Sequence, residues 1–294
     1  MVYAFILSQE PFFPVTAMCR ALSASRSCYY VYRNNGHASE SPPAKTVEAR
    51  VVGAFQLHKR RYGVRRLVPE LLGQGLKIGR YKVAGILRRN GLKAIQPKSF
   101  VPRTTDSRHP YPISPNLLKD KPLPLTINQV WVGDITYIPL KSGGWCYLAV
   151  WMDLFSRKVT GWQLLGHMKE PLVVEAFKKA WGNRNAGKGL VVHSDRGGQY
   201  AGKNFRKLLG RHHVSQSMSG VDNPYDNAFM ESYFSRFKAE LLQGRAFDGL
   251  ENARQEIFEY IETYYNPVRR HSSLGYISPV AFEQKVSYTQ KAEV

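Results

Sequence analysis

Cysteine is scarce in this chain, and the few that occur exclude two kinds of site. The 294 residues include 3 cysteines, Cys19, Cys28 and Cys146. An odd number at wide separations fits neither a disulfide framework nor the paired ligand spacing of a structural zinc site. We therefore expect reduced thiols that pack as ordinary side chains in an intracellular protein.

Long apolar runs are absent as well. No stretch approaches the roughly 20 apolar residues of a membrane-spanning helix. The opening stretch, MVYAFILSQE, holds a short apolar run without a basic segment before it or a small-residue cleavage site after it. The sequence therefore predicts neither a membrane span nor a secretory signal, and we expect a cytoplasmic protein.

Acidic residues are few relative to basic ones. The chain has 42 lysines and arginines against 22 aspartates and glutamates, a net charge of +20. Residues 1–128 hold 21 basic and 6 acidic side chains, whereas residues 129–294 hold 21 and 16. Such an excess implies a polyanionic partner. A membrane-surface protein would show a basic amphipathic helix or a short polybasic run, and the sequence has neither, so nucleic acid is the favoured partner.

Two helical parts are predicted before residue 96. Residues 1–45 form a short N-terminal segment of helix-turn-helix type, and residues 46–95 form a basic helix-turn-helix DNA-binding domain. In the basic domain, Gly75 and Gly91 follow the second and third helices, as expected where a helix ends. The expected helices cover residues 15–22 and 27–33 in the first part and 46–58, 64–72 and 79–90 in the second.

Positive charge is densest in the second of these parts. Residues 46–100 carry 13 basic and 2 acidic side chains, which cluster at turns and on the third helix. We predict that this third helix lies in a groove of duplex DNA with phosphate contacts around it. A basic surface that only keeps the protein soluble is the alternative. The candidate DNA-contacting side chains are Arg60, Arg61, Arg65, Arg66, Arg80, Lys82, Arg88 and Arg89.

Prolines mark the boundary that follows. Residues 96–125 hold 7 of the 17 prolines and few large apolar side chains, so they predict an extended linker rather than a core. We expect the main domain to cover residues 126–285, including a C-terminal helical extension, and a short tail to cover residues 286–294.

Past the linker, β-rich stretches replace the helical pattern. QVWVGDITYIPL, WCYLAVWMDLF and KVTGWQLL predict three antiparallel strands, with SGG as a turn after the first. Helical and strand-like stretches then alternate: PLVVEAFKKAWGN, GLVVHSD, KNFRKLLGRHH, a short strand at 214–218 and an amphipathic helix within 222–241. We therefore expect an α/β fold, a mixed sheet with helices on both faces, preceded by an all-α region.

Three acidic residues stand out in this part. Asp134 lies in the middle of a strand, where a carboxylate is costly unless a positive group meets it. Asp195 ends the strand GLVVHSD shortly before two glycines, which let the backbone approach a ligand closely. Glu231 lies beside the apolar stripe of its helix, on a face shared with Lys238. Simple turn chemistry remains the alternative for Asp195, and a solvated polar face for Glu231.

The helix that carries Glu231 has a clear start and a clear periodicity. Asn223 or Asp226 is expected to cap it, with Pro224 tolerated in the first turn. Its apolar stripe consists of Met230, Phe234, Phe237 and Leu241, and its polar face of Asn227, Glu231, Ser235 and Lys238.

Carboxylates without histidine or cysteine partners suit a hard, oxygen-preferring ion such as Mg²⁺ or Mn²⁺. Two such ions about 3.5–4 Å apart would activate a water or a sugar hydroxyl and stabilise the leaving oxygen of an in-line displacement. Lys238 lies about 10 Å of helix rise beyond Glu231, where it can hold a phosphate or a base near the reacting bond.

The order and spacing of these residues resemble a known family. Between Asp195 and Glu231 lie 35 residues, and Lys238 follows seven positions after the glutamate. This pattern is similar to that of DDE transposases and retroviral-type integrases. The stretches WVGDITYI, HSDRGGQY, DNAFMESYFSRFKAEL and YNPVRRHSSLGYISPVAFE further resemble the B-frame protein (OrfB) of the "IS-three" family of bacterial insertion sequences, and the likeness covers nearly the whole chain.

The resemblance implies an RNase H-like integrase catalytic core in which Asp134, Asp195 and Glu231 are the catalytic and metal-binding triad for two Mg²⁺ ions. It implies cleavage of element ends and transfer of the freed 3′-hydroxyl to another phosphodiester, without a covalent protein–DNA intermediate. It also implies a nucleoid-associated bacterial protein that forms homo-oligomers on DNA, with an A-frame protein (OrfA) as partner or fused segment. Because the chain starts at its own methionine and has no long heptad region, we expect the B product alone.

Two alternatives to this activity remain. One is a DNA-binding modulator of transposition without independent catalytic activity, and the other is a plain nuclease of the same fold. Several polar residues also keep two interpretations. His193 either orients a ligand or packs, Asp153 is either a ligand or a strand-end turn residue, and Arg196 pairs with Asp195 or with phosphate. The cluster after the last core helix serves DNA contact or structural hydrogen bonding; it comprises Tyr264, Asn266, Arg269, His271 and Ser272.

Overall fold

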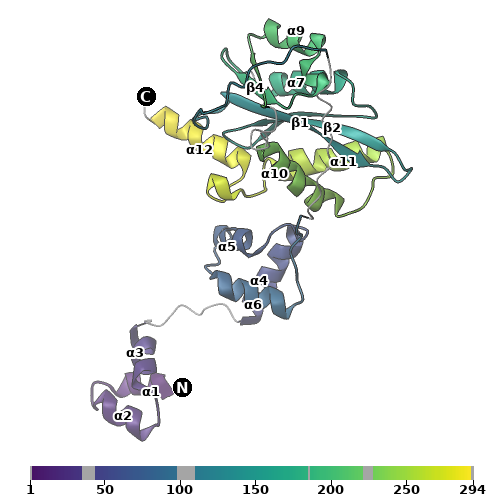
Figure 1. Cartoon of the computed structure of the whole chain (residues 1–294). Coiled ribbons are helices and arrows are strands. Elements are labelled where there is room, and N and C mark those ends of the chain that lie inside the picture. The colour runs from purple at the N-terminus through teal and green to yellow at the C-terminus, as the bar shows by residue number, and fades with distance from the viewer. Residues whose placement is uncertain (1, 35–43, 98–109, 185, 221–227, 293–294) are drawn as a thin grey trace.

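Helices fill the N-terminal third of the chain and a five-stranded sheet forms the centre of the rest (Figure 1). The structure, a computed structural model, describes residues 2–34, 44–97, 110–184, 186–220 and 228–292. Apolar side chains in these residues gather into separate clusters, one for each helical part and one on each face of the sheet.

The first helical part contains one helix more than expected. Helices α2 (Val15–Ala21) and α3 (Arg26–Asn34) confirm the two predicted ones, and α1 (Val2–Gln9) precedes them. Their small core is Ile6, Met18, Cys19 and Tyr29. The sequence pattern did not reveal α1 because apolar residues occur all around it, which leaves no helical periodicity to detect.

The second helical part confirms the predicted trio of helices. They are α4 (Ala44–Leu57), α5 (Val64–Gly73) and α6 (Arg80–Arg89). Gly75 and Gly91 adopt φ angles of 78° and 64°, the left-handed conformation in which glycine commonly ends a helix. The buried faces meet around Val51, Phe55, Leu67 and Leu71.

The sheet is mixed, as expected. Its order is β3-β2-β1-β4-β5, in which β1, β2 and β3 are antiparallel while β4 runs parallel to both β1 and β5. The strands are β1 (Val130–Pro139), β2 (Trp145–Asp153), β3 (Val159–Leu165), β4 (Val191–Ser194) and β5 (Ser215–Met218).

Both faces of the sheet are covered, because side chains along β1 point alternately to opposite sides. Trp131 packs into the cluster beneath α7 and α9, and Val132 packs into the cluster beneath α10 and α11 (Figure 1). The first face is covered by α7 (Pro171–Arg184), α8 (Gly198–Ala201) and α9 (Lys203–Arg211). The second is covered by α10 (Ala228–Phe237), the π-helical η2 (Lys238–Leu242), α11 (Leu250–Phe258) and the π-helical η3 (Glu259–Tyr265).

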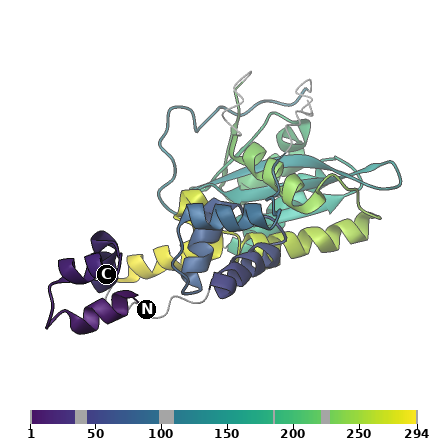
Figure 2. The same ribbon diagram turned by 90° about the horizontal axis from the view of Figure 1, so that it is seen from below.

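The chain ends with the short 3₁₀ helix η4 (Ser272–Leu274) and α12 (Pro279–Ala292). Seen from below, the blue helices α4–α6 lie against the yellow-green and yellow C-terminal segment (Figure 2). Hydrogen bonds between Tyr62 and the backbone at Val268 and Arg270 join the two. Within the described residues, no helix combines the length and apolarity needed to cross a membrane.

Candidate active site

Asp134 and Asp195 lie side by side where the parallel strands β1 and β4 meet. In the pairing of β1 with β4, Val132 is opposite His193. Two residues further along each chain, Asp134 is therefore opposite Asp195, which directly follows the last residue of β4. Neighbouring strands are about 4.8 Å apart, and residues two apart point to the same face. Both carboxylates thus belong to the face that α10 covers.

Glu231 and Lys238 approach the same face from the helix above it. Glu231 lies in the first turn of α10 with an exposed side chain, and Lys238 is the half-buried first residue of η2. The predicted stripe of Met230, Phe234, Phe237 and Leu241 is buried and holds this helix against the sheet. The expected cap residues Asn223 and Asp226, together with Pro224 and Asn227, lie outside the described residues.

The pKa of Asp134 depends on the other three site residues. Burial raises the pKa of the Asp134 carboxyl well above its ordinary value, and the negative charges of Asp195 and Glu231 raise it further. An N–H···O bond of 2.8 Å from the Ile135 amide and the positive charge of Lys238 act in the opposite direction. All four predicted site residues are therefore near enough to interact, and the Asp134–Asp195 pair is repulsive.

The oxygen donors of these carboxylates fit a hard cation, although they do not form a complete coordination site. Among the described residues, no three His, Cys, Asp or Glu side chains converge closely enough to hold a metal ion. Asp134 and Asp195 form a close pair with oxygen donors only, and the exposed Glu231 side chain lies at its edge. A divalent ion between the paired carboxylates would relieve their repulsion, which is the physical reason that the residues fit one.

A tight turn fixes the position of Asp195. Its Oδ1 accepts a 3.0 Å hydrogen bond from the Gly197 amide. A Cβ added at Gly197 would lie 3.1 Å from that same oxygen, so a larger residue there would press on the carboxylate. The glycine pair after Asp195 thus allows the backbone to fold back onto the acid.

For His193 and Asp153, which kept two interpretations, the structure favours a structural role. His193 is buried, with Nδ1 2.8 Å from the Ser217 hydroxyl and Nε2 3.3 Å from that of Ser219, so it links β4 to β5 and the residue after it. Asp153 is also buried, and it accepts backbone hydrogen bonds from Asn128, Phe155 and Ser156. Arg196 Nε donates to the Ser219 carbonyl at 2.7 Å.

Structural hydrogen bonding also accounts for the centre of the cluster at 264–272. The Asn266 amide bonds both the N–H and the C=O of Val159, at 2.9 and 3.0 Å. Arg269 is buried and forms a two-pronged ion pair with Glu240, at 2.6 and 2.8 Å. Sequence reasoning missed Glu240, although a glutamate beside the buried Leu241 signals that a cation must meet it.

The candidate DNA-contacting arginines divide into two groups. Arg60, Arg65, Arg80, Lys82, Arg88 and Arg89 have exposed side chains. In contrast, Arg61 and Arg66 turn toward the sheet-containing core, where their Nε atoms donate to the carbonyls of Glu240 at 3.3 Å and Arg270 at 3.0 Å. These two guanidiniums join the domains in this arrangement.

Comparisons with known proteins agree with this architecture. Models of an integrase core domain match residues 126–224 and 212–279, and a model of an HTH-like domain matches residues 44–100. The transposase InsF for insertion sequence IS3A of Escherichia coli (strain K12) is 39% identical over 287 residues, which cover 97% of this chain and 99% of that protein. The transposase for insertion sequence element IS904 of Lactococcus lactis subsp. lactis (strain IL1403) is 38% identical over 235 residues, 80% of this chain and 92% of that protein.

Among solved structures, the HTLV-2 integrase catalytic core domain in complex with magnesium (trimeric form) aligns with a TM-score of 0.42 and 21% identity, covering 54% of this chain and 98% of that one. The mixed sheet with flanking helices is the RNase H-like fold that the sequence predicted, preceded by the expected all-helical region. The near-complete alignment with InsF, together with both domain matches, shows that the chain belongs to the IS3 family of insertion-sequence transposases.

Proposed function

We propose that this transposase cleaves the ends of an insertion element and joins the freed 3′-hydroxyls to target DNA by a two-metal DDE mechanism. One observation carries the proposal: Asp134 of β1 and Asp195, directly after β4, lie side by side, and α10 and η2 bring Glu231 and Lys238 to them. Asp195 follows the carboxyl end of β4 in a sheet covered on both faces, a place where ligands commonly bind.

Asp134, Asp195 and Glu231 are the proposed ligands of two Mg²⁺ ions, with Mn²⁺ as a substitute. When bound, such ions activate a hydroxyl nucleophile and stabilise the leaving oxygen of an in-line displacement. The chain's own contribution is to hold two anions close together at a fixed spacing. The exposed Glu231 side chain, whose charge acts on Asp134, would complete the ligand set.

Lys238 and the exposed arginines supply the DNA contacts in this proposal. Lys238 lies near enough to Asp134 to interact with its charge, so it can hold a phosphate beside the reacting bond. The HTH-like domain binds the element end through α6, where Arg80, Lys82, Arg88 and Arg89 are exposed. We further propose that the protein works in the bacterial cytoplasm as a homo-oligomer on DNA, with an A-frame protein as partner.

The test incubates the purified chain with labelled element ends, Mg²⁺ and target DNA. We expect joined products, whereas a plain nuclease gives cut products only and a DNA-binding modulator gives only shifted bands. Asp195→Asn is expected to abolish joining while retaining the band shift, because it removes a metal ligand without altering the DNA-binding helices. Asp248→Asn is the matched control, since that exposed acid pairs with Lys141 outside the site. Loss of both joining and binding in Asp195→Asn would show that Asp195 is structural.

A further inference from the structure

The HTH-like domain docks on the segment that follows η3. The Tyr62 hydroxyl donates to the Val268 carbonyl at 3.2 Å and accepts from the Arg270 amide at 2.7 Å. Arg270 in turn donates to Glu70 of α5 at 2.7 Å. Because Tyr62 is fully buried and both of its bonds cross between the domains, the contact has a defined geometry.

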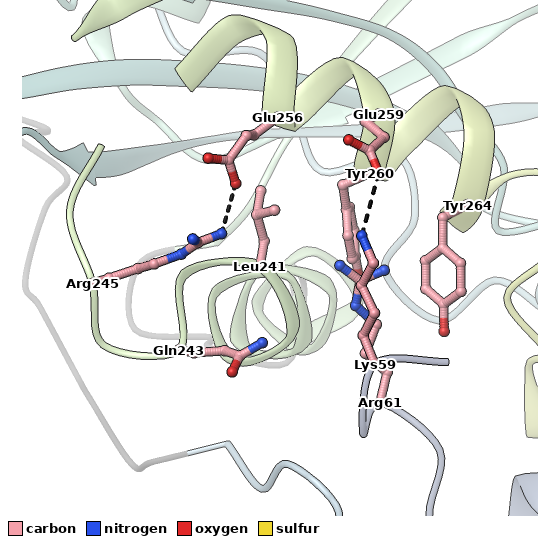
Figure 3. A pocket seen from close by; sticks show the side chains of 9 residues that line it. All are labelled: Lys59, Arg61, Leu241, Gln243, Arg245, Glu256, Glu259, Tyr260 and Tyr264. Carbon is pink, nitrogen blue, oxygen red and sulfur yellow. Dashed lines mark hydrogen bonds and ion pairs between the residues drawn. The ribbon is translucent and has the colours of Figure 1, made fainter. Parts of the chain in front are cut away.

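A second set of contacts lies beside the first, around a small cavity between the domains (Figure 3). The Arg61 guanidinium lies over the Tyr264 ring, 4.4 Å from its centroid, and also 5.2 Å from that of Tyr260. Lys59 reaches Glu259 at 3.4 Å, as the dashed line in Figure 3 marks. Arg61 also donates to the backbone carbonyl of Glu240, so these contacts reach η2, the helix that follows α10.

Glu240 is the point at which these contacts meet the core. Its side chain is 4% exposed, and both carboxylate oxygens accept hydrogen bonds. Arg269 donates to both, Tyr260 donates to Oε2 at 2.9 Å, and Arg66 of the HTH-like domain lies 3.9 Å from Oε1. Burial alone would raise the pKa of Glu240, but the charge and hydrogen bonds of Arg269 lower it, so the carboxylate stays ionised.

We call Glu240 and its partners Arg269, Tyr260 and Arg66 the node. The position of Glu240 on its helix connects this node to the candidate active site. It lies two residues after Lys238 and nine after Glu231, which places it about half a turn around the helix from Glu231. One side of the helix therefore carries the site residues and the other carries the node. The local π-helical turn, closed by the Gln243 N–H to Lys238 C=O bond of 3.2 Å, begins at Lys238.

We propose that Glu240 is a positioning residue, which fixes the depth and rotation of the helix carrying Glu231 and Lys238, and that Arg66 and Arg61 make the docked HTH-like domain part of that support. This inference rests on the proposed function for the identity of the site. Its physical basis is that Glu231 must reach the Asp134–Asp195 pair from a separate element, so a small shift of the helix misplaces it.

The first test compares Glu240→Gln with Glu283→Gln. Both variants neutralise a carboxylate in an ion pair with arginine, but the half-buried Glu283 bonds to Arg184, Ser156 and Lys158 rather than to the HTH-like domain or η3. At a temperature where both are folded, we expect Glu240→Gln to lower kcat for end cleavage by about tenfold or more with KM for DNA unchanged. We expect Glu283→Gln to lower the Tm while leaving kcat within twofold. Arg269→Lys, which keeps the charge but loses the fork, should fall between Glu240→Gln and wild type.

The second test addresses the contribution of the HTH-like domain. Arg66→Met removes its charge from the node, and we expect a smaller fall in kcat in the same direction. Arg50→Met is the matched control, because Arg50 donates to the Gln74 carbonyl within the HTH-like domain. Equal kcat values for wild type and Glu240→Gln overturn the positioning role, and equal values for wild type and Arg66→Met overturn the domain's part in it.

Two measurements that need no catalysis separate this inference from the proposed function. Hydrogen exchange of residues 228–242 should be faster in Glu240→Gln than in Glu283→Gln, and Mn²⁺ should bind several-fold more weakly to Glu240→Gln only. If wild type shifts DNA without cutting it, the proposed function fails while these two results still decide the role of Glu240. Unchanged exchange and unchanged Mn²⁺ affinity in Glu240→Gln overturn it.

Discussion

Arg184 and Glu283 form a two-pronged ion pair, with Nη1 2.8 Å from Oε2 and Nη2 2.7 Å from Oε1. The pair joins α7 to α12, and Arg184 also reaches the buried Asp153 at 3.2 Å. Planar guanidinium and carboxylate groups in this geometry form charge-assisted hydrogen bonds that are stronger than neutral ones.

Removing the arginine should therefore be costly. We expect Arg184→Met to lower the free energy of unfolding by about 3 kcal/mol, because the buried Asp153 loses its arginine partner and Glu283 keeps only Lys158. Urea denaturation followed by circular dichroism measures the change. Lys178→Met is the control, since its exposed pair with Glu175 should contribute less than about 0.5 kcal/mol. A loss as small as in the control would contradict the expectation.

The repulsion between Asp134 and Asp195 predicts a gain in stability when one charge is removed. We expect Asp134→Asn to raise the free energy of unfolding in metal-free buffer by about 1 kcal/mol, because burial and the Asp195 charge both disfavour the ionised acid. The asparagine side chain can still accept the bond from Ile135. Thermal unfolding with and without Mg²⁺ provides the measurement, and Mg²⁺ should stabilise wild type more than the variant. A less stable Asp134→Asn would refute this account of the pair.

Stability should also fall as the pH is lowered below about 6.5, the ordinary pKa of histidine. Burial and the positive charge of Arg269 hold the pKa of His271 well below that value. Between the two pKa values the unfolded chain binds a proton that the folded chain does not, so acid favours unfolding. We expect His271→Asn to remove about 1–2 kcal/mol of the stability difference between pH 7 and pH 5. The exposed His167→Gln is the control, and an unchanged difference in His271→Asn would be the contrary result.

Two glycines near α7 should respond oppositely to the same substitution. A Cβ at Gly161 of β3 would lie 2.4 Å from the Ala180 amide nitrogen and 2.6 Å from the Ala176 carbonyl oxygen. Gly161→Ala must therefore push α7 off the sheet, and we expect a loss of about 2–3 kcal/mol. Gly182, inside α7, has nothing within 4 Å of its added Cβ, so Gly182→Ala should gain about 0.5–1 kcal/mol. Chemical denaturation of both variants gives the comparison, and a stable Gly161→Ala would contradict the close packing.

Local patterns predicted most of the fold. Gly75 and Gly91 mark helix ends by their own backbone preference, and the alternation along β1 assigns Trp131 and Val132 to opposite faces. These features depend on residues close in the sequence. Helix α1 was missed because its apolar residues show no period, so nothing local distinguished it.

The candidate site was predictable to a similar degree, and for a similar reason. The positions of Asp134 and Asp195 follow from strand boundaries, which local pattern gives. The roles of Arg61, Arg66 and Glu240 depend on how separate parts of the chain dock. A single sequence shows that these arginines are basic but does not show which surface meets another domain, so it could not place Arg61 and Arg66 at the domain junction.

The sheet order also has a consequence for synthesis of the chain. β4 lies beside β1 although the two are separated in the chain by β2, β3 and α7, and α10 comes later still. The ribosome must synthesise β2, β3 and α7 after Asp134 before the two aspartates can become neighbours. A chain truncated before β4 therefore keeps the HTH-like domain and the strands β1 to β3 but lacks the acidic pair.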